Sequence, residues 1–326
     1  MKVLFIGGTG NISTSVSRLV LAAGIDLWLL NRSGAGIGVE GRAAKVIQAS
    51  IHNEAEVESA LNNHRWDVVV NWVAFDEADI ERDIRLFQGR TAQYVFISSA
   101  SCYQNPNPLL PITEETPLGN PYWDYSRNKI RAEERLMRAH VEADFPVTIV
   151  RPSHTYATVI PITIGGWDQY TTINRIKQGL PIVVQDDGTS LWTLTHADDF
   201  ANGFIGLLGK KQALGEAYHI TSDEVLSWNK IYQLTAQSLG CEAKIIHVDS
   251  KVICEHDQEY IGTLLGDKAV NTVFDNSKIK AINPSFKAKV AYEDGIKKTL
   301  AWFEGNKDHQ IIDDNTNALI EKLIRL

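Results

Sequence analysis

Tyr125 and Lys129 have the residue types and the spacing that proton transfer requires. They stand four residues apart in Tyr125-Ser126-Arg127-Asn128-Lys129, at the start of a stretch with helical period, so both side chains should lie on one helix face. An ordinary tyrosine has a pKa of about 10 and is a poor base at neutral pH. A neighbouring ammonium group favours the phenolate, and the pair therefore predicts an acid–base site.

Serine side chains follow an apolar segment upstream of this pair, in Phe96-Ile97-Ser98-Ser99-Ala100-Ser101-Cys102-Tyr103. We expect a strand to end at Ser98, and ligands bind at the carboxyl ends of strands in parallel sheets. Ser99 would then hydrogen-bond a substrate hydroxyl or carbonyl group and complete a proton-transfer set with Tyr125 and Lys129. A Tyr-x-x-x-Lys spacing is common by chance, so the pair gains weight from the motifs around it.

The most informative of these motifs is a glycine-rich run, Gly7-Gly8-Thr9-Gly10-Asn11-Ile12-Ser13, which follows the expected first strand and opens the first helix. Glycines there allow a tight turn and a close approach to a dinucleotide pyrophosphate, which backbone N–H groups and the positive helix end attract. Gly7 and Gly10 are the principal candidates for cofactor binding, with Thr9, Asn11 and Ile12 beside them. Ser13 replaces the third glycine of G-x-x-G-x-x-G, and a turn without a ligand is the alternative.

The expected second strand ends in Asn31-Arg32-Ser33, without the acidic residue that would bind the ribose hydroxyls of NAD. Arg32 and Ser33 instead offer a positive charge and a hydroxyl group suited to a 2′-phosphate. We therefore expect Asn31 and Arg32 to contact the cofactor, and NADP to be preferred over NAD. The alternative is a solvated surface arginine.

The elements that position these residues follow an α/β pattern, because apolar segments of strand length alternate with segments of helical period. This pattern predicts a Rossmann-type, doubly wound parallel sheet with helices on both faces. The expected strands are Val3–Ile6, Asp26–Leu30, Lys45–Gln48, Asp67–Asn71, Tyr94–Ser98 and Val147–Val150. The expected helices of this part are Ser13–Ala23, Ala55–Asn62, Asp79–Gln88 and Ser126–Ala143.

The regular alternation ends after Arg151-Pro152, where proline, glycine and aspartate turn signals become frequent. We expect a dinucleotide-binding domain at residues 1–155, to which residues 194–222 return, and a smaller substrate-binding lobe with the C-terminal helices at 156–193 and 223–326. The later expected helices are Ala197–Leu208, Trp228–Leu239, Tyr292–Phe303 and Thr316–Ile324.

Charge and composition disfavour several other classes of protein. The formal net charge is −8 at pH 7 and the basic residues are scattered, which argues against nucleic-acid binding. Three cysteines without metal-ligand spacing fit a reducing, cytoplasmic location, and no signal-peptide core or membrane span is expected. The histidines also lack ligand spacing, and His196-Ala197-Asp198-Asp199 is typical of a capped helix start, so no metal site is predicted.

In the order of its motifs the chain resembles the extended short-chain dehydrogenase/reductases, the NAD-dependent epimerase/dehydratase family that includes UDP-galactose 4-epimerase and nucleotide-sugar dehydratases. The resemblance runs almost from end to end. Besides the loop at 7–13 and the segment from Ser98 to Tyr103, it rests on Pro111-Ile112-Thr113-Glu114-Glu115-Thr116-Pro117, Arg151-Pro152-Ser153, Leu194-Thr195-His196-Ala197-Asp198-Asp199 and Phe274-Asp275-Asn276-Ser277-Lys278.

The resemblance implies roles for individual residues. Tyr125 becomes the general acid/base, Lys129 lowers its pKa and holds the nicotinamide ribose, and Ser99, four residues before Tyr103, orients the substrate. The further cofactor contacts that it implies are Asn11 and Ile12 at the pyrophosphate, Ser50 and Ile51 at the adenine, Val73 and Ala74 after the fourth strand, and Pro152 and His154 near the nicotinamide.

Ser101, Trp123 and Trp192 are expected at the substrate together with Ser99. Trp192 stands near the position where many sugar-nucleotide members of that family place an arginine that contacts diphosphate. A tryptophan stacks on rings but cannot pair with phosphate, which leaves nucleotide sugars open as substrates. Trp123 would either wall the site or pack within the lobe.

The activity implied by the resemblance is NAD(P)-dependent hydride transfer at a hydroxyl or carbonyl carbon of a sugar-like small molecule. A retained cofactor would give epimerisation or dehydration and an exchanged one reduction or oxidation, although Ala100-Ser101 replace the acidic pair usual in dehydratases. The alternative is a non-catalytic NAD(P)-binding regulator or RNA-binding relative, but such proteins usually lose the tyrosine or the lysine. The family often forms a homodimer through the helix that carries the tyrosine and its neighbour, here Asp79–Gln88, but this is analogy alone and leaves the oligomeric state open.

Overall fold

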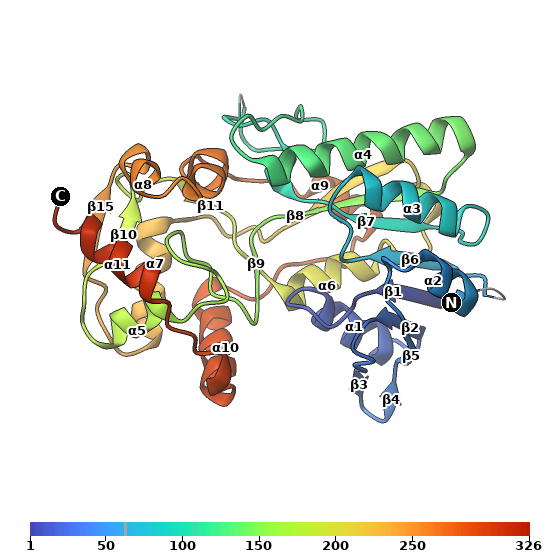
Figure 1. Cartoon of the computed structure of the whole chain (residues 1–326), viewed down its shortest axis with the longest axis horizontal. Coiled ribbons are helices and arrows are strands. Elements are labelled where there is room, and N and C mark those ends of the chain that lie inside the picture. The colour runs from blue at the N-terminus through green and yellow to red at the C-terminus, as the bar shows by residue number, and fades with distance from the viewer. Residues whose placement is uncertain (62–63, 108) are drawn as a thin grey trace.

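A seven-stranded sheet forms the centre of the larger domain in the computed structural model, which describes residues 1–61, 64–107 and 109–326 (Figure 1). Every neighbouring pair of strands in it is parallel. The strand order is β13 (Glu216–Ile220), β8 (Val147–Pro152), β7 (Tyr94–Ile97), β6 (Val68–Asn71), β1 (Lys2–Ile6), β2 (Asp26–Asn31) and β5 (Lys45–Gln48). The doubly wound Rossmann-type sheet predicted from the sequence is therefore confirmed.

Side-chain alternation along the strands divides the core of this domain into two layers. Val3 and Phe5 of β1 pack under α1 (Ser13–Ala22) and α6 (Ala197–Ile205). Leu4 and Ile6 pack against the opposite layer, formed by α2 (Glu54–Leu61), α3 (Glu77–Phe87) and α4 (Asp124–Ala143). Strands buried on both faces read as continuous apolar runs, which is why they were recognisable in the sequence.

The smaller lobe has its own apolar core, and it is built from short strands and helices. Its strands form the pairs β10 (Ile182–Gln185) with β15 (Ile245–Val248) and β11 (Leu191–Trp192) with β14 (Leu226–Ser227). Its helices are α5 (Thr171–Lys177), α7 (Trp228–Ser238), α8 (Ser250–His256), the π-helical segment η3 (Ile261–Lys268), α10 (Tyr292–Gly305) and α11 (Asp314–Leu323). A further parallel pair joins β9 (Thr155–Tyr156) to β12 (Thr195–His196). In the sequence β9 follows β8, and β12 directly precedes α6.

Most element boundaries agree with the sequence to within a few residues, and the differences have local causes. The helix expected from Ser126 begins at Asp124, so Tyr125 lies in its first turn. The helix expected at Ala197–Leu208 ends at Ile205, and the expected Asn62 end of α2 falls outside the described residues. The short elements α5, α8, η3 and the seventh strand β13 were not predicted, because segments this short carry little periodicity.

One C-terminal segment within residues 223–326 packs on the larger domain. Ile279 of α9 (Ser277–Ile282) and Phe286 join the core under β13 and α6. The reason is apolar complementarity: Phe286 lies against the face of α6 at Gly203, where an added Cβ would come within 3.2 Å of the Phe286 ring.

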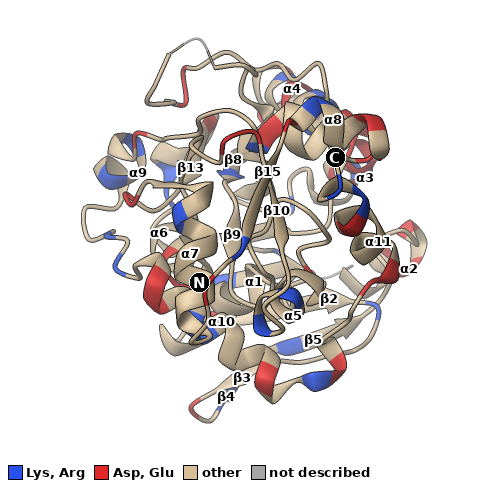
Figure 2. Ribbon diagram, turned by 90° about the vertical axis from the view of Figure 1, so that its left-hand side faces the viewer, with Lys and Arg blue, Asp and Glu red and all other residues tan. Residues whose placement is uncertain are grey.

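Charged residues of both signs are interspersed over the side of the molecule drawn in Figure 2. Some of these charged residues form ion pairs between helices, for example Arg138 of α4 with Glu77 of α3, whose charged groups lie 3.3 Å apart. Among the described helices, none is long and apolar enough to cross a membrane. In the same residues there is no cluster of three or more His, Cys, Asp or Glu side chains able to hold a metal ion.

Candidate active site

A cavity of about 970 Å³ lies between the sheet domain and the lobe. The sheet domain contributes the turn after β1, the ends of β7 and β8 and the start of α4, and the lobe contributes η3, the 159–169 loop and the start of α11. Eleven of the residues singled out in the sequence line it: Gly10, Asn11, Ile12, Ser99, Ser101, Trp123, Tyr125, Lys129, Pro152, His154 and Trp192.

The glycine turn has the backbone that the sequence predicts. Gly7 and Gly8 have φ angles of 90° and 111°, which side-chain-bearing residues rarely adopt. A Cβ at Gly8 would also lie 2.7 Å from the Leu29 side chain, so the turn packs tightly on β2. Ser13 accepts a hydrogen bond from the Gly10 N–H at 2.9 Å and thereby closes the turn in place of the expected third glycine.

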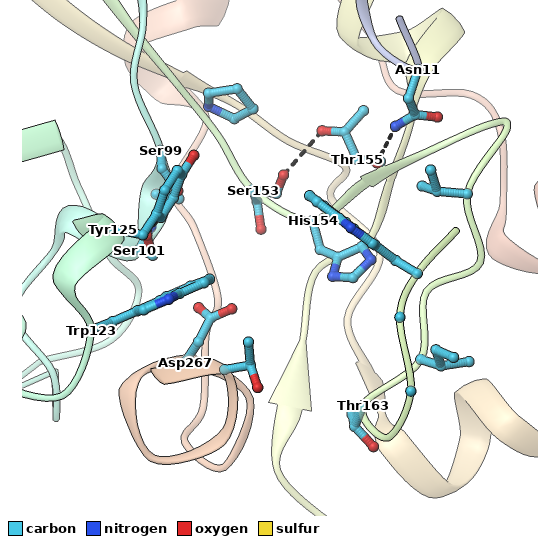
Figure 3. A pocket seen from close by; sticks show the side chains of 18 of the residues that line it. Asn11, Ser99, Ser101, Trp123, Tyr125, Ser153, His154, Thr155, Thr163 and Asp267 are labelled. Atoms are coloured by element: carbon cyan, nitrogen blue, oxygen red, sulfur yellow. Dashed lines mark hydrogen bonds between the residues drawn. The ribbon is translucent and has the colours of Figure 1, made fainter. Parts of the chain in front are cut away.

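Asn11 connects the glycine turn to the segment that follows β8. Its side-chain amide donates to the carbonyl oxygen of Thr155 at 2.8 Å, and its carbonyl accepts from the Thr158 N–H at 2.9 Å. The backbone of Asn11 was expected at the pyrophosphate. Its side chain also fixes the position of the turn relative to the segment that leads into the lobe (Figure 3).

Lys129 is buried beneath the cavity, one helical turn after Tyr125. Its ammonium group donates to the carbonyl oxygens of Ala74, at 2.6 Å, and Ile97, at 2.8 Å. Burial lowers the pKa of this ammonium from 10.5 to about 8, because the charged form loses solvation. An ammonium has three N–H donors, so one remains for a ligand.

Tyr125 stands at the cavity wall with Ser99 and Trp123 beside it (Figure 3). Burial raises the pKa of its phenol to about 12, an effect that the Ser99 hydroxyl partly offsets and the Asp267 carboxylate reinforces. The Trp123 ring lies 5.0 Å from the Tyr125 ring, centroid to centroid, and the Phe75 ring 6.3 Å. The phenol is therefore protonated at neutral pH in this environment and suited to donate a proton.

A chain of hydroxyl groups holds Ser99 in place. Its Oγ lies 2.9 Å from Ser101 Oγ, which accepts from Ser126 Oγ at 2.7 Å. Asn120 adds hydrogen bonds to the Ser101 and Gly266 carbonyl oxygens, at 3.0 and 2.7 Å. Ser101 was expected at the substrate; it lines the cavity and also orients Ser99. Ser126 and Asn120 were missed because each is an ordinary polar residue with no motif of its own.

His154 and Trp192 form the opposite wall. The His154 Nε2 atom is buried without a hydrogen-bond partner, and burial lowers the pKa of its imidazole to about 3, so the ring is neutral. Trp192 is 2% exposed, its indole N–H donates to the Val270 carbonyl oxygen at 3.1 Å, and its ring packs against Trp228. Trp192 thus offers only a ring surface to the cavity.

The remaining cofactor candidates stand at the carboxyl ends of β2, β5 and β6, beside the glycine turn. The Asn31 amide donates to the Ala35 carbonyl oxygen at 2.8 Å, and this turn leaves Arg32 exposed. Ile51 and Ala74 are buried in the core, Ser50 is half-buried, and Val73 is exposed. Thr9 is exposed in the glycine turn. These residues follow the strand ends at which dinucleotides bind in such sheets.

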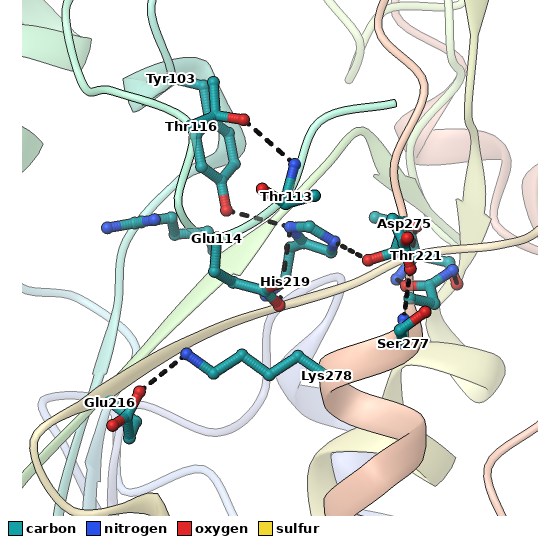
Figure 4. Close-up of polar contacts among 12 residues, drawn as sticks. Tyr103, Thr113, Glu114, Thr116, Glu216, His219, Thr221, Asp275, Ser277 and Lys278 are labelled. Carbon is teal, nitrogen blue, oxygen red and sulfur yellow. Dashed lines mark hydrogen bonds and ion pairs between the residues drawn. The ribbon is translucent and has the colours of Figure 1, made fainter. Parts of the chain in front are cut away.

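A second polar network lies behind the site and ties β13 to the C-terminal segment (Figure 4). The His219 Nε2–H donates to the Asp275 carbonyl oxygen at 2.7 Å, so the Tyr103 hydroxyl, 3.0 Å away, donates to Nδ1. Glu114 accepts from the His219 backbone N–H at 3.1 Å. The motif residues Tyr103, Glu114 and Asp275 therefore serve the architecture of the site.

Asp267 is a cavity residue that the sequence did not mark as functional, and Trp167 is one whose stretch of chain was expected to face the substrate. Asp267 projects from η3 toward Trp123, and Trp167 is 57% exposed at the cavity rim. A lone aspartate in an unrecognised π-helical segment carries no spacing signal, whereas the count of tryptophans around the lobe already drew attention to Trp167.

Comparison with known proteins places this geometry in a family. The family model described as NAD dependent epimerase/dehydratase family matches residues 3–221. The 2′-dehydrokanamycin reductase of Streptomyces kanamyceticus is 25% identical over 291 residues, which are 89% of this chain and 81% of that protein. The chloroplast stem-loop binding protein of 41 kDa b of Arabidopsis thaliana is 24% identical over 263 residues, 77% of this chain and 66% of that protein.

Among solved structures, the UDP-glucuronic acid 4-epimerase of Bacillus cereus, in complex with UDP-glucuronic acid and NAD, superimposes with a TM-score of 0.74. It is 18% identical, and the match covers 94% of this chain and 100% of that one, so it supports the fold. The family match spans the glycine turn, Ser99, Tyr125 and Lys129, which agrees with the resemblance read from the motifs. The chain is an enzyme of the NAD-dependent epimerase/dehydratase family.

Proposed function

We propose that this enzyme transfers hydride between a nicotinamide cofactor and a hydroxyl or carbonyl carbon of a sugar-like substrate, with Tyr125 exchanging the proton. One observation carries the proposal: Ser99, Tyr125 and Lys129 meet at a single cavity whose other end is the glycine turn. The named activity of the reductase relative, which matches most of this chain, supports a reduction.

The residues at the sheet edge fit a dinucleotide. The positive φ angles of Gly7 and Gly8 turn the backbone tightly at the first strand end, and Gly10, Asn11 and Ile12 line the cavity. Ser50 and Ile51 would flank the adenine, Val73 and Ala74 the adjoining ribose, and Pro152 and His154 the nicotinamide. When bound, the nicotinamide supplies or accepts the hydride.

Residues of the chain itself carry out the proton transfer to the substrate oxygen. Tyr125, protonated at neutral pH, donates its hydroxyl proton to a substrate carbonyl oxygen as that oxygen becomes an alcohol. Ser99, held by Ser101, donates a hydrogen bond to the same oxygen and fixes its distance from the phenol. Lys129 is the cation nearest the resulting phenolate, with its Nζ 5.8 Å from the ring centroid, and stabilises it.

Trp123 and Trp192 supply ring surfaces on two sides of the space in front of Tyr125. Aromatic faces of this kind favour the apolar side of a sugar-like ring, and the hydroxyl groups of Ser99 and Ser101 favour its polar edge. The combination of aromatic surfaces and hydroxyl groups in one cavity supports a sugar-like substrate.

We further propose that NADP is preferred over NAD. Arg32 is exposed at the end of β2, where no acidic residue stands. The Asn31 amide and the Ser33 hydroxyl are both engaged in the turn with Ala35, so the Arg32 guanidinium is the group left to meet a 2′-phosphate.

The test is consumption of NADPH or NADH with a panel of carbonyl compounds, oxidised sugars and nucleotide sugars, monitored by nicotinamide absorbance. Epimerisation with retained cofactor is followed by product chromatography in the same samples. We expect turnover in at least one class. Cofactor binding without turnover in any of them contradicts the proposal.

The stem-loop binding relative gives a reason to test a second function, RNA binding. The net charge of −8 and the mixed surface charges oppose it, since nucleic-acid binding needs a basic surface. A gel-shift titration with a stem-loop RNA, at several salt concentrations, separates the two functions: a specific, salt-dependent complex without any turnover would favour the binding protein.

A further inference from the structure

We infer that the cavity takes a polyhydroxylated ring that carries protonated amines, and not a nucleotide diphosphate. This inference rests on the proposed function, because it names the substrate class of the same site. It is carried by the charges that face the cavity, by its aromatic rim and by one unpartnered buried nitrogen.

Acidic side chains predominate among the charged residues that line the cavity. Four carboxylates face it, from Asp257, Glu259, Asp267 and Asp313. The one lysine is Lys129, and there is no arginine in the described lining. A nucleotide diphosphate would bring its negative charges against these carboxylates, whereas a protonated amine would be attracted to them.

The two ammonium groups nearest the cavity are already engaged. Lys129 donates to two backbone carbonyl oxygens at the end occupied by the proton-transfer residues. Lys268, which does not line the cavity, lies 3.2 Å from the Asp267 carboxylate and 6.0 Å from the ring centroids of Trp123 and Trp192. Lys268 therefore partly offsets Asp267 from outside the lining, and within the lining the carboxylates of Asp257, Glu259 and Asp313 still outnumber the ammonium group of Lys129.

Asp267 is the carboxylate nearest the reacting end. It projects from η3 into the cavity, below Trp123 (Figure 3). Burial raises its pKa, so the charged carboxylate there is stabilised by any cation brought next to it. A substrate amine adjacent to the reacting carbon would add a second cation to that of Lys268, from the cavity side of the carboxylate.

The aromatic residues suit the same ligand. Trp167 is 57% exposed at the rim, its ring 5.9 Å from that of His154, and Tyr260 lines the cavity beside the acidic residues. Ring faces that border carboxylates attract ammonium groups by cation–π interaction and stack on the apolar faces of sugar rings.

The unpartnered nitrogen of His154 indicates a polar ligand group. Its Nε2 atom is buried and has no hydrogen-bond partner among the described residues, and His154 is one of the residues that line the cavity. Because the ring is neutral, it adds no positive charge for a phosphate and is able to exchange a hydrogen bond with a hydroxyl or amine.

The experiment is isothermal titration of the full-length enzyme, with and without saturating NADPH, using three probes: kanamycin, maltotriose and UDP-glucose. We expect kanamycin to bind at least tenfold more tightly than the neutral maltotriose, and UDP-glucose to bind most weakly. Affinity for kanamycin should fall as salt is raised, because the attraction is ionic.

Two variants locate the effect. Asp267→Asn should weaken kanamycin binding about tenfold, which corresponds to about 1.4 kcal/mol. Glu259→Gln, at the exposed rim, should weaken it severalfold without disturbing the buried Asp267–Lys268 pair. Glu255→Gln removes an exposed carboxylate of α8 outside the cavity lining and should leave binding unchanged.

Equal binding of kanamycin and maltotriose, no kanamycin binding, or tighter binding of UDP-glucose than of kanamycin overturns the inference. An equal loss in Glu255→Gln and Glu259→Gln does so too, because the attraction would then belong to the general surface charge. The titration needs no turnover, so a failure of the proposed hydride transfer is recognised separately in the cofactor assay.

Discussion

The ammonium nitrogen of Lys129 lies 2.6 Å from the carbonyl oxygen of Ala74, and this hydrogen bond ties the catalytic helix α4 to the loop after β6. A second hydrogen bond, to Ile97, fixes the lysine on the end of β7 as well. The lysine thus joins three elements of the sheet edge beneath Tyr125. Its position is set before any ligand binds, which keeps the ordering cost of binding low.

The buried ammonium predicts a pH-dependent stability. The Lys129 pKa is about 8 in the folded protein and 10.5 as the ordinary value, so between these pH values the unfolded chain binds more protons. The unfolding free energy of the parent, relative to that of Lys129→Met, should therefore rise from pH 8 to pH 10.5, by up to about 3 kcal/mol. Urea denaturation at a series of pH values measures it.

Lys322→Met, at an exposed position of α11, controls for the loss of one surface lysine. Its difference from the parent should stay nearly constant over the same range. A Lys129→Met difference that is flat, or that falls with rising pH, would show that the ammonium is not destabilised by burial.

Arg32→Ala tests the cofactor preference. The variant should bind NADPH at least about tenfold more weakly, because a charge-assisted contact to the 2′-phosphate is lost, and NADH nearly as the parent does. Fluorescence titration with both cofactors measures this. Arg18→Ala, an exposed arginine of α1, is the matched control and should change neither affinity. Equal affinity of the parent for NADPH and NADH would remove the proposed role of Arg32.

Gly262→Ala tests whether η3 positions the aromatic wall. A Cβ at Gly262 would lie 2.3 Å from the Trp123 ring, so the indole has to move, and Trp123 is in contact with Tyr125. We expect stability to fall by about 1–3 kcal/mol, as in overpacked cores, together with a lower kcat. Gly305→Ala is the control, since a Cβ there meets no atom within 4 Å. A kcat and stability equal to the parent's would mean that Trp123 does not support Tyr125.

The fold and the proton-transfer set could be predicted from the sequence because both leave short-range signals. The buried strands read as apolar runs, the glycine turn follows one of them directly, and Tyr125 and Lys129 share one helix. Asp267 could not be predicted: it approaches Tyr125 only because η3 packs against Trp123 at Gly262. The same holds for Asn120, which contacts Ser101 and Gly266 from a loop without a motif.

The structure gives Ser13 and Trp192 more specific roles than their positions in the sequence motifs indicate. Ser13, which replaces a glycine in the motif, completes the turn by accepting the Gly10 N–H. Trp192, expected to stack on a substrate, is almost fully buried and its indole N–H is satisfied by Val270, so its contribution is a fixed wall. Neither relationship is visible in spacing, because both depend on which backbone group faces the side chain.

The most direct test of the central claim is the rate of hydride transfer in Tyr125→Phe under single-turnover conditions, with a substrate identified from the panel. The phenyl ring keeps the contact with Trp123 and removes only the hydroxyl. We predict a rate lower by about 10²–10⁴-fold, as for loss of a general acid, with NADPH affinity unchanged and with the exposed Tyr122→Phe variant behaving as the parent. A Tyr125→Phe rate equal to the parent's would contradict the assignment of Tyr125 as the proton donor.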